Sequence, residues 1–342
     1  AEGQNVRHLE PMGFIKFDLL GLSTLKMMEG CIEHILRRHH GVENPTFAEV
    51  LNYYNEKLHP DVIDMDNQEV YENVFHAGRW AGIFQFTEQG AQKFCTRVKP
   101  RNIIDVSAIT SIYRPGPLSA GVHDEYLEAK ESPQYIRYLT DESREITQET
   151  FGFLIFQEQI ALLANKLGGL TLDEGNMLRK VLTKKGTGKA DVTDQLRIKF
   201  INGCVDKGIK VDDASSLWNK FEYFSGYGFN KSHAVSYSVI SFQCAWLWNY
   251  YPAEWMAAFL DKEPETRKEK AINIAKQYGF DIAPLDINKS GTVWEISDDG
   301  KTLIQPLTSI KGLGVSAIEQ ILNCRPFEDA EFPVSNNNRC YS

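Results

Sequence analysis

The sequence predicts a mainly α-helical protein with small β parts, an α+β fold in which helices make up most of the chain. Apolar residues recur at the helical period in long segments, of which residues 23–36 and 102–113 are clear examples. The clearest β signal is short, because two extended runs, residues 293–296 and 302–304, flank an Asp-Asp-Gly turn at 298–300. The β part is therefore expected to be one small element near the C-terminal end.

Composition is that of an ordinary globular protein, with 342 residues, 42% hydrophobic and 24% charged. This length suffices for two or three domains with cores of their own. The most apolar run, residues 235–260, is interrupted by polar residues, so no membrane span is expected. The six cysteines are scattered without a paired spacing, which favours reduced thiols in the cytoplasm. A net charge of −9 argues against nucleic-acid binding by the whole surface but allows a local basic cleft.

Residues 13–22 are predicted to form a strand near the start of the chain. Alternation places Ile15 and Phe17 on an apolar face that needs a core, and Lys16 and Asp18 on the opposite face. A cation and a carboxylate in an otherwise apolar strand cost free energy unless they are used. Two interpretations remain open: a charged face that meets solvent, or a site where the carboxylate binds a metal and the lysine a phosphate.

Helices are predicted along most of the remaining chain. Ser23 can cap a helix that ends near residue 40, where four basic residues suit the negative end of the helix dipole. Two or three short helices are expected between residues 46 and 75. Further helices are predicted near residues 89–97, 102–113, 151–167, from 171 onward, 234–250 and 262–278.

Residues 114–117, Arg-Pro-Gly-Pro, predict a rigid loop in place of a helix. The two prolines on either side of a glycine disfavour helical hydrogen bonding and restrict the backbone. A rigid loop can present one side chain, here Arg114, to a ligand. The alternative is a plain turn with an exposed arginine.

Residues 179–189 hold five cations and no acid, in a chain whose net charge is negative. The glycines at 186 and 188 loosen the backbone after the helix. A flexible basic loop suits phosphate groups, and the alternative is a solvated helix end. The cations are Arg179, Lys180, Lys184, Lys185 and Lys189.

Residues 226–233, Gly-Tyr-Gly-Phe-Asn-Lys-Ser-His, form the most unusual local sequence. The glycines let the backbone approach a ligand closely, and Tyr227 offers a flat face. Asn230, Lys231 and His233 offer donors at the start of the next helix, where anions are favoured. This segment is predicted to be a nucleotide or phosphate site, or alternatively a capping loop for a packed helix.

Residues 309–314, Ser-Ile-Lys-Gly-Leu-Gly, precede a predicted helix and fit the turn of a helix-hairpin-helix. In such a turn Lys311 and the backbone amides at Gly312 and Gly314 would meet a DNA phosphate. The tail, residues 334–342, has no apolar period and is predicted to be disordered.

Seven short stretches occur together in the order and approximate spacing of one family. They are Lys16-Phe17-Asp18 with Leu20-Gly21-Leu22, Arg114-Pro115-Gly116-Pro117, Gln157-Glu158-Gln159, residues 226–233, Tyr251-Pro252-Ala253-Glu254, Asp286-Ile287-Asn288 and Lys311-Gly312-Leu313-Gly314. The ordered set resembles the alpha subunit of bacterial DNA polymerase III, the C-family replicative DNA polymerase, over about residues 12–330. Each motif alone is unspecific, whereas the ordered set is specific.

The resemblance implies a domain organisation. Residues 1–22 would carry the C-terminal strand of the palm, and residues 23–285 would be the fingers domain. Residues 286–333 would hold a small β element and the start of the tandem helix-hairpin-helix, followed by the tail at 334–342.

The resemblance also implies the functional residues. Asp18 would be the third of three catalytic aspartates that hold two Mg²⁺ ions for nucleotidyl transfer. The residues expected to bind the incoming nucleotide are Lys16, Arg179, Tyr227, Asn230, Lys231 and His233. Those expected to bind DNA are Lys184, Lys185, Lys189, Lys311, Gly312 and Gly314.

The sequence departs from the family in what it lacks. No Asp-x-Asp strand for the first two catalytic aspartates precedes residue 13, and the family pattern stops near residue 333. The expected function is therefore that of a DNA-directed DNA polymerase segment, inactive alone and dependent on upstream and downstream polymerase segments. Its expected partners are primer-template DNA, deoxynucleoside triphosphates and other replisome subunits. The alternative is an inactive or regulatory remnant that binds DNA and nucleotides without catalysis.

Overall fold

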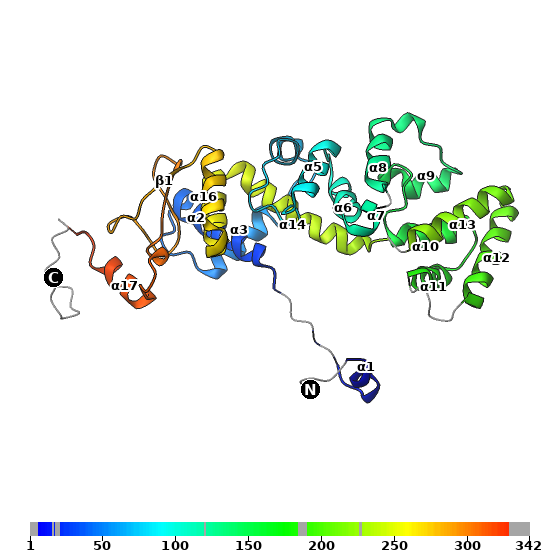
Figure 1. The fold of residues 1–342 in the computed structure, drawn as a ribbon, viewed down its shortest axis with the longest axis horizontal. Helices are drawn as coiled ribbons and strands as arrows, with labels where there is room; N and C mark the ends of the chain where they lie inside the picture. Colours follow the sequence, from blue (N-terminus) through cyan, green and yellow to red (C-terminus); the bar gives the residue numbers. More distant parts are fainter. Residues whose placement is uncertain are drawn as a thin grey trace. The chain divides into compact units, whose positions relative to one another are not determined.

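The computed structural model describes residues 6–15, 17, 21–119, 121–183, 190–225 and 228–327 (Figure 1). Its contacts divide the chain into two compact units. The central unit is residues 43–256, and the discontinuous unit combines residues 1–42 with residues 257–342. The division falls inside helix α15 (Pro252–Lys262).

Helices account for all the regular elements described in the central unit. They are α3 (Phe47–Lys57), α4 (Gln68–Val70), the π-helix η2 (Tyr71–His76), α5 (Gln89–Val98), α6 (Ile103–Ile112), α7 (Pro115–Ser119), α8 (Val122–Glu131), η3 (Pro133–Tyr135), α9 (Asp141–Thr147), η4 (Gln148–Thr150), α10 (Gln157–Lys166), α11 (Leu172–Thr183), α12 (Ala190–Asp206), α13 (Val211–Ser225) and α14 (Lys231–Tyr250).

The discontinuous unit holds the described strands. Its elements are α1 (Val6–Leu9), η1 (Glu10–Met12), α2 (Ser23–His40), α16 (Glu265–Gln277), β1 (Asp281–Ala283), β2 (Glu295–Ile296), β3 (Thr302–Ile304), η5 (Leu307–Ser309) and α17 (Val315–Asn323). The predicted fold class, mainly α with small β parts, is confirmed.

Helix α14 is the central packing element of the central unit. It packs against α6 and η2, and its Phe242, Leu247 and Trp248 are fully buried. Polar bonds fix its position as well: the Ser241 hydroxyl donates to the Phe84 carbonyl over 2.9 Å, and the Gln243 amide donates to the Leu58 carbonyl over 2.7 Å. A helix apolar on most sides, as the sequence predicts here, is a buried helix.

Helices α10 to α13 enclose a second core in the central unit. Phe200 of α12 lies against Trp218 and Phe221 of α13, with ring centroids 5.6 and 5.2 Å apart. Leu163 of α10 and Leu178 of α11 complete this cluster. Because α10 and α11 share a core, the first residue of α10 and the last turns of α11 are held close together.

The hairpin predicted around residues 298–300 is confirmed in the discontinuous unit. β2 pairs antiparallel with β3, and β1 pairs with β3 in parallel, which gives the order β1-β3-β2. Arg38 at the end of α2 donates to the Ile296 and Ser297 carbonyls over 3.1 and 3.0 Å. The sheet is therefore tied to α2 across more than 250 residues of sequence.

The strand predicted over residues 13–22 is wrong for the residues described there, which form no strand. Ile15 and Phe17, expected to face a core, are 76% and 80% exposed. An extended segment becomes a strand only when a neighbouring strand takes up its backbone hydrogen bonds, and the described parts of this chain provide none for it. The assignment of this segment to a palm domain stays a prediction.

Three other local predictions need correction. Helix α2 begins at Ser23, but its N-cap is Leu22 and no side chain caps it. Residues 115–119 form the short helix α7 instead of a loop, because a proline is tolerated in the first turn, where its missing N–H has no intrahelical partner. Helix α10 begins at residue 157, six residues later than expected, because the residue before it, Phe156, is extended and pairs with Phe229.

Two bulk expectations can be compared with the described residues. No helix among them has the length and apolar character needed to cross a membrane. Four cysteines, Cys31, Cys95, Cys204 and Cys244, are buried free thiols. Cys324 is disulfide-bonded, so the expectation of reduced thiols is wrong for that residue. The predicted disordered tail at 334–342 lies outside the described residues.

Candidate nucleotide-binding site

Two segments about 70 residues apart in sequence meet at the N-terminal ends of α10 and α14. Phe156 and Phe229 form a parallel bridge, in which the Phe229 amide donates to the Ile155 carbonyl over 3.0 Å. The Gln157 amide in turn donates to the Phe229 carbonyl over 2.9 Å. This short pairing brings the Gln-Glu-Gln motif beside residues 228–231, so the two motifs form one site.

Gln157 connects this site to helix α11. Its side-chain oxygen accepts a bond from Arg179 Nη1 over 2.8 Å, and its side-chain nitrogen donates to the Gly228 carbonyl over 2.9 Å. A Cβ at position 228 would lie 3.0 Å from Gln157 Cγ. Glycine at 228 therefore permits the close approach that lets the amide reach both partners.

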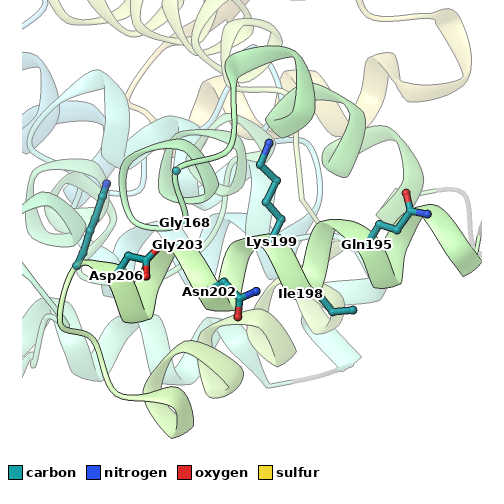
Figure 2. A pocket seen from close by; sticks show the side chains of 9 residues that line it. Gly168, Gln195, Ile198, Lys199, Asn202, Gly203 and Asp206 are labelled. Atoms are coloured by element: carbon teal, nitrogen blue, oxygen red, sulfur yellow. The ribbon is translucent and has the colours of Figure 1, made fainter.

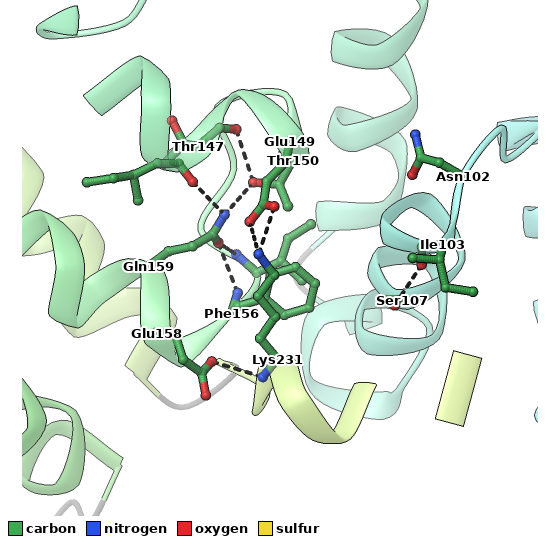
Figure 3. A network of polar contacts seen from close by, with 12 residues as sticks. Asn102, Ile103, Ser107, Thr147, Glu149, Thr150, Phe156, Glu158, Gln159 and Lys231 are labelled. Atoms are coloured by element: carbon green, nitrogen blue, oxygen red, sulfur yellow. Dashed lines mark hydrogen bonds and ion pairs between the residues drawn. The ribbon is translucent and has the colours of Figure 1, made fainter. Parts of the chain in front are cut away.

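The carboxylate of Glu158, a residue of α10, accepts hydrogen bonds at the N-terminus of α14. One carboxylate oxygen accepts from the Asn230 side-chain amide and the other from the Lys231 backbone amide, both over 2.9 Å. Asn230 also caps the helix, because its side-chain oxygen accepts from the His233 backbone amide over 2.8 Å. The anion that the helix terminus favours is supplied here by the protein itself, as the dashed contacts in Figure 3 show.

Lys231 is held by a second acid. Its ammonium group lies 2.7 Å from each carboxylate oxygen of Glu149, which belongs to η4 (Figure 3). It also lies 5.7 Å from the centre of the Phe156 ring. Lys231 and Glu149 are each about 30% exposed, so solvent screens the ion pair and its contribution to stability is small.

Gln159 holds the backbone that directly precedes α10. Its side-chain oxygen accepts from the Ile155 and Phe156 backbone amides over 2.9 and 3.0 Å. Its nitrogen donates to the Thr150 hydroxyl over 2.7 Å and to the Ile146 carbonyl over 3.3 Å. Gln159 is buried, so all its polar atoms are satisfied inside the protein, as buried amides require.

A row of neighbouring aromatic rings continues the site along α14. The Arg114 guanidinium lies 4.7 Å from the centre of the Phe229 ring, and burial lowers the pKa of Arg114. His233 lies between Phe229 and Tyr237, with ring centroids 5.5 and 4.1 Å apart. Phe84 stacks on Tyr237 at 5.2 Å. The two neighbouring rings restrict the position of the His233 imidazole, which is exposed.

The structure brings together four of the predicted nucleotide-binding residues: Arg179, Asn230, Lys231 and His233. Tyr227 and Lys16 lie outside the described residues. So does Asp18, the predicted catalytic and metal-binding residue. The predicted DNA-binding residues Lys184, Lys185 and Lys189 lie outside them too.

The predicted helix-hairpin-helix residues belong to the discontinuous unit. Lys311 is exposed, Gly312 has φ +87°, and Gly314 is the N-cap of α17. The helix after the turn is confirmed. The described element before it is the one-turn η5, so a full first helix of the motif is not formed there.

The sequence prediction missed the partners that hold the site. The sequence indicates Gln157 and Glu158 only as part of a motif in a helix, and no sequence pattern indicates Glu149. Glu149 lies 82 residues from Lys231, and no local spacing connects them. The motif Gln-Glu-Gln beside a helix start is the only signal that could have indicated Glu158.

A separate groove of about 640 Å³ lies along α12 (Figure 2). None of the predicted site residues lines it. Its cations are engaged: Lys199 binds Glu174 and Lys207 binds the Lys166 carbonyl. Among the described residues, no group of three or more metal-binding side chains is placed to hold a metal ion.

The family of the chain follows from a direct comparison of its sequence. A family model for the bacterial DNA polymerase III alpha subunit finger domain matches residues 24–208. The match includes Gln157, Glu158 and Arg179 and covers more than half of the chain. The chain therefore belongs to the bacterial DNA polymerase III alpha subunit family.

Individual relatives extend the similarity beyond the finger domain. The chain is 33% identical to the DNA polymerase III subunit alpha of Campylobacter jejuni over 334 residues, which are 96% of this chain and 26% of that protein. It is 33% identical to the Aquifex aeolicus protein over 318 residues and 31% identical to the Bacillus subtilis protein over 327 residues. These matches cover 93% and 94% of this chain, and 26% and 27% of those proteins. The chain thus spans about a quarter of the length of the curated relatives it matches.

Proposed function

We propose that this chain is the fingers-containing segment of a DNA-directed DNA polymerase, and that it binds the incoming deoxynucleoside triphosphate for addition to a primer 3′-hydroxyl. The observation that supports this proposal most strongly is the convergence of Arg179, Asn230, Lys231 and His233 at the start of α14. Polymerase III alpha subunits are the relatives of the chain.

The chemistry of the site suits a triphosphate. The Arg179 guanidinium is planar and can bind two phosphate oxygens at once. The N-terminus of α14 carries a partial positive charge. Glu158 and Glu149 hold Asn230 and Lys231 in the free protein, so a bound phosphate would compete with these carboxylates for the same donors.

Two other groups of residues are proposed to bind DNA. Lys184, Lys185 and Lys189 follow α11 in sequence and would lie near the backbone of the primer-template. Lys311, Gly312 and Gly314 would meet a phosphate through an ammonium group and backbone amides. Replisome subunits and further polymerase segments are proposed as protein partners.

In this chain, Asp18 is the residue proposed to bind a metal. The described residues do not form a metal site of their own, so no step of the reaction is assigned to a metal through them. Asp18 would contribute one ligand for Mg²⁺, and aspartates from another polymerase segment would contribute the others. In the alternative, a remnant that binds without catalysis, nucleotide and DNA binding would persist but no primer would be extended by any combination of segments.

Nucleotide binding can be tested by removing Arg179. Arg179→Ala should weaken the binding of dATP, in the presence of Mg²⁺ and a primer-template with thymine as the next base, by tenfold or more, since it removes a charge-assisted bond. Binding of the primer-template alone should change little. Arg197→Ala, which removes an exposed arginine of α12, serves as the matched control. A larger loss of primer-template affinity than of dATP affinity would assign Arg179 to the DNA backbone instead.

A further inference from the structure

One side chain, Gln157, joins the two elements that carry the proposed nucleotide ligands. Its oxygen holds Arg179 of α11 and its nitrogen holds the Gly228 carbonyl, two residues before Asn230. Arg179 is the proposed ligand on α11, whereas Asn230, Lys231 and His233 belong to α14 and its cap. The amide is thus a direct polar connection between the two groups.

The backbone of Gln157 is held in place by its own hydrogen bonds, independently of its side chain. It is the first residue of α10, and its amide donates to the Phe229 carbonyl in the bridge between the two segments. The side chain of Gln159 accepts hydrogen bonds from the Ile155 and Phe156 amides, which directly precede Gln157. The side chain therefore extends from a rigid point, and its own two hydrogen bonds fix its remaining freedom.

Only an amide satisfies both partners at this position. Arg179 needs an acceptor and the Gly228 carbonyl needs a donor, and glutamine carries both on one planar group. A glutamate would offer no donor to the carbonyl, and an aliphatic side chain would offer neither group. An arginine side chain has high rotamer entropy, so a fixed acceptor at 2.8 Å reduces the directions in which the guanidinium points.

We propose that Gln157 is a positioning residue for nucleotide binding, which orients the Arg179 guanidinium relative to the loop of residues 228–231. This inference rests on the proposed function, because it takes Arg179 as a phosphate ligand. A guanidinium carries five N–H donors, so the bond to Gln157 is compatible with simultaneous binding of a phosphate. Gln157 acts through Arg179 and needs no contact with the nucleotide.

A double-mutant cycle on the full chain tests this inference. The dissociation constant for dATP is measured, with Mg²⁺ and primer-template present, for Gln157→Met, Arg179→Ala and the double variant. Gln157→Met should weaken dATP binding about tenfold in the unaltered chain, the size expected for a hydrogen bond to a charged group. In the chain that already carries Arg179→Ala, Gln157→Met should change the dissociation constant for dATP less than about twofold.

Gln157→Ala removes the same amide without filling its space and should give the same pair of ratios. If Gln157→Met lowers the urea unfolding midpoint, the dATP dissociation constants of Gln157→Ala are used in its place to test the positioning role. Two glutamines serve as controls. Gln195→Met, at an exposed position of α12, should leave dATP binding unchanged. Gln159→Met should lower the unfolding midpoint, because it leaves the Ile155 and Phe156 amides without their acceptor.

The possible results separate the two proposals. If Arg179→Ala leaves dATP binding unchanged, the proposed role of Arg179 fails. If Arg179→Ala weakens binding but Gln157→Met does not, or if their effects simply multiply, Gln157 has no positioning role and the proposed function stands. Coupled effects on dATP binding, with primer-template binding unaltered, support the positioning role.

Discussion

Gln159 is the side chain on which the local structure of the site depends most. Replacing it with methionine leaves two buried backbone amides, at Ile155 and Phe156, without their acceptor. Each such amide costs about 1–3 kcal/mol, so Gln159→Met should lower the unfolding free energy by about 2 kcal/mol or more. Urea unfolding measures this, with Gln195→Met as the control. A loss below about 0.5 kcal/mol, typical of surface substitutions, would contradict the assigned bonds.

Asp261 makes the stability of the discontinuous unit depend on pH. It accepts a bond from the Trp294 amide over 3.0 Å, but burial raises its pKa from 3.8 to about 7. Between about pH 4 and pH 7, the folded protein therefore keeps a proton on Asp261 that the unfolded chain has lost. The stability contributed by Asp261 is full below about pH 4 and is lost as pH rises to about 7. Burial also raises the pKa of Glu295, which acts in the same direction.

Substituting Asp261 with asparagine isolates this effect. Asp261→Asn keeps an acceptor for Trp294 and carries no charge, so it should stabilise the protein above pH 7 by on the order of 2–4 kcal/mol. Below pH 4 the difference should vanish. Unfolding midpoints across pH 4–8 measure it, with Asp213→Asn at an exposed position as the control. An equal change at every pH would show that the carboxyl of Asp261 ionises normally.

The residues that meet at the candidate site could be picked out in the sequence, but their interactions could not, and their role in nucleotide binding stays a prediction. Arg179, Asn230, Lys231 and His233 were found because unusual residue types cluster in short motifs. Their partners Gln157 and Glu149 could not be found this way, since Gln157 lies 22 residues from Arg179 and Glu149 lies 82 residues from Lys231. The carboxylate of Glu158 at the start of α14 is likewise a product of tertiary pairing.

At the scale of elements, Asn230 has two roles that one substitution can test. Asn230→Ala removes the helix cap and the bond to Glu158. Loss of a cap costs about 1 kcal/mol, so this variant should lose about 1–2 kcal/mol of unfolding free energy. Asn202→Ala, at an exposed position inside α12, should be neutral or slightly stabilising because alanine is the better helix former. Equal stability of the two variants would contradict the capping role.

Elements were predictable where the sequence is locally consistent. Helix α2 and the hairpin of β2 and β3 follow from periodicity and turn chemistry alone. The short helix α7 was missed because prolines suppress only the interior of a helix. The segment over residues 13–22 was predicted as a strand from its alternation, yet a strand also requires a partner, which sequence alternation cannot supply.

At the scale of the molecule, the fold class was predictable and the division into units was not. Helical periodicity dominates the sequence, so a mainly α protein follows. The discontinuous unit joins residues 1–42 to residues 257–342, and its internal ties, such as Arg38 to the Ile296 carbonyl, are long-range. The domain bounds suggested by the resemblance, including fingers over residues 23–285, remain predictions.

We propose that this chain supplies the fingers and one catalytic aspartate to a DNA polymerase. Primer extension tests it most directly, with this chain mixed with a separately produced segment carrying the other two palm aspartates of a polymerase III alpha subunit. We expect extension when both segments are present, none with either alone, and none when this chain carries Asp18→Ala. Extension that survives Asp18→Ala at the unaltered rate would contradict the claim.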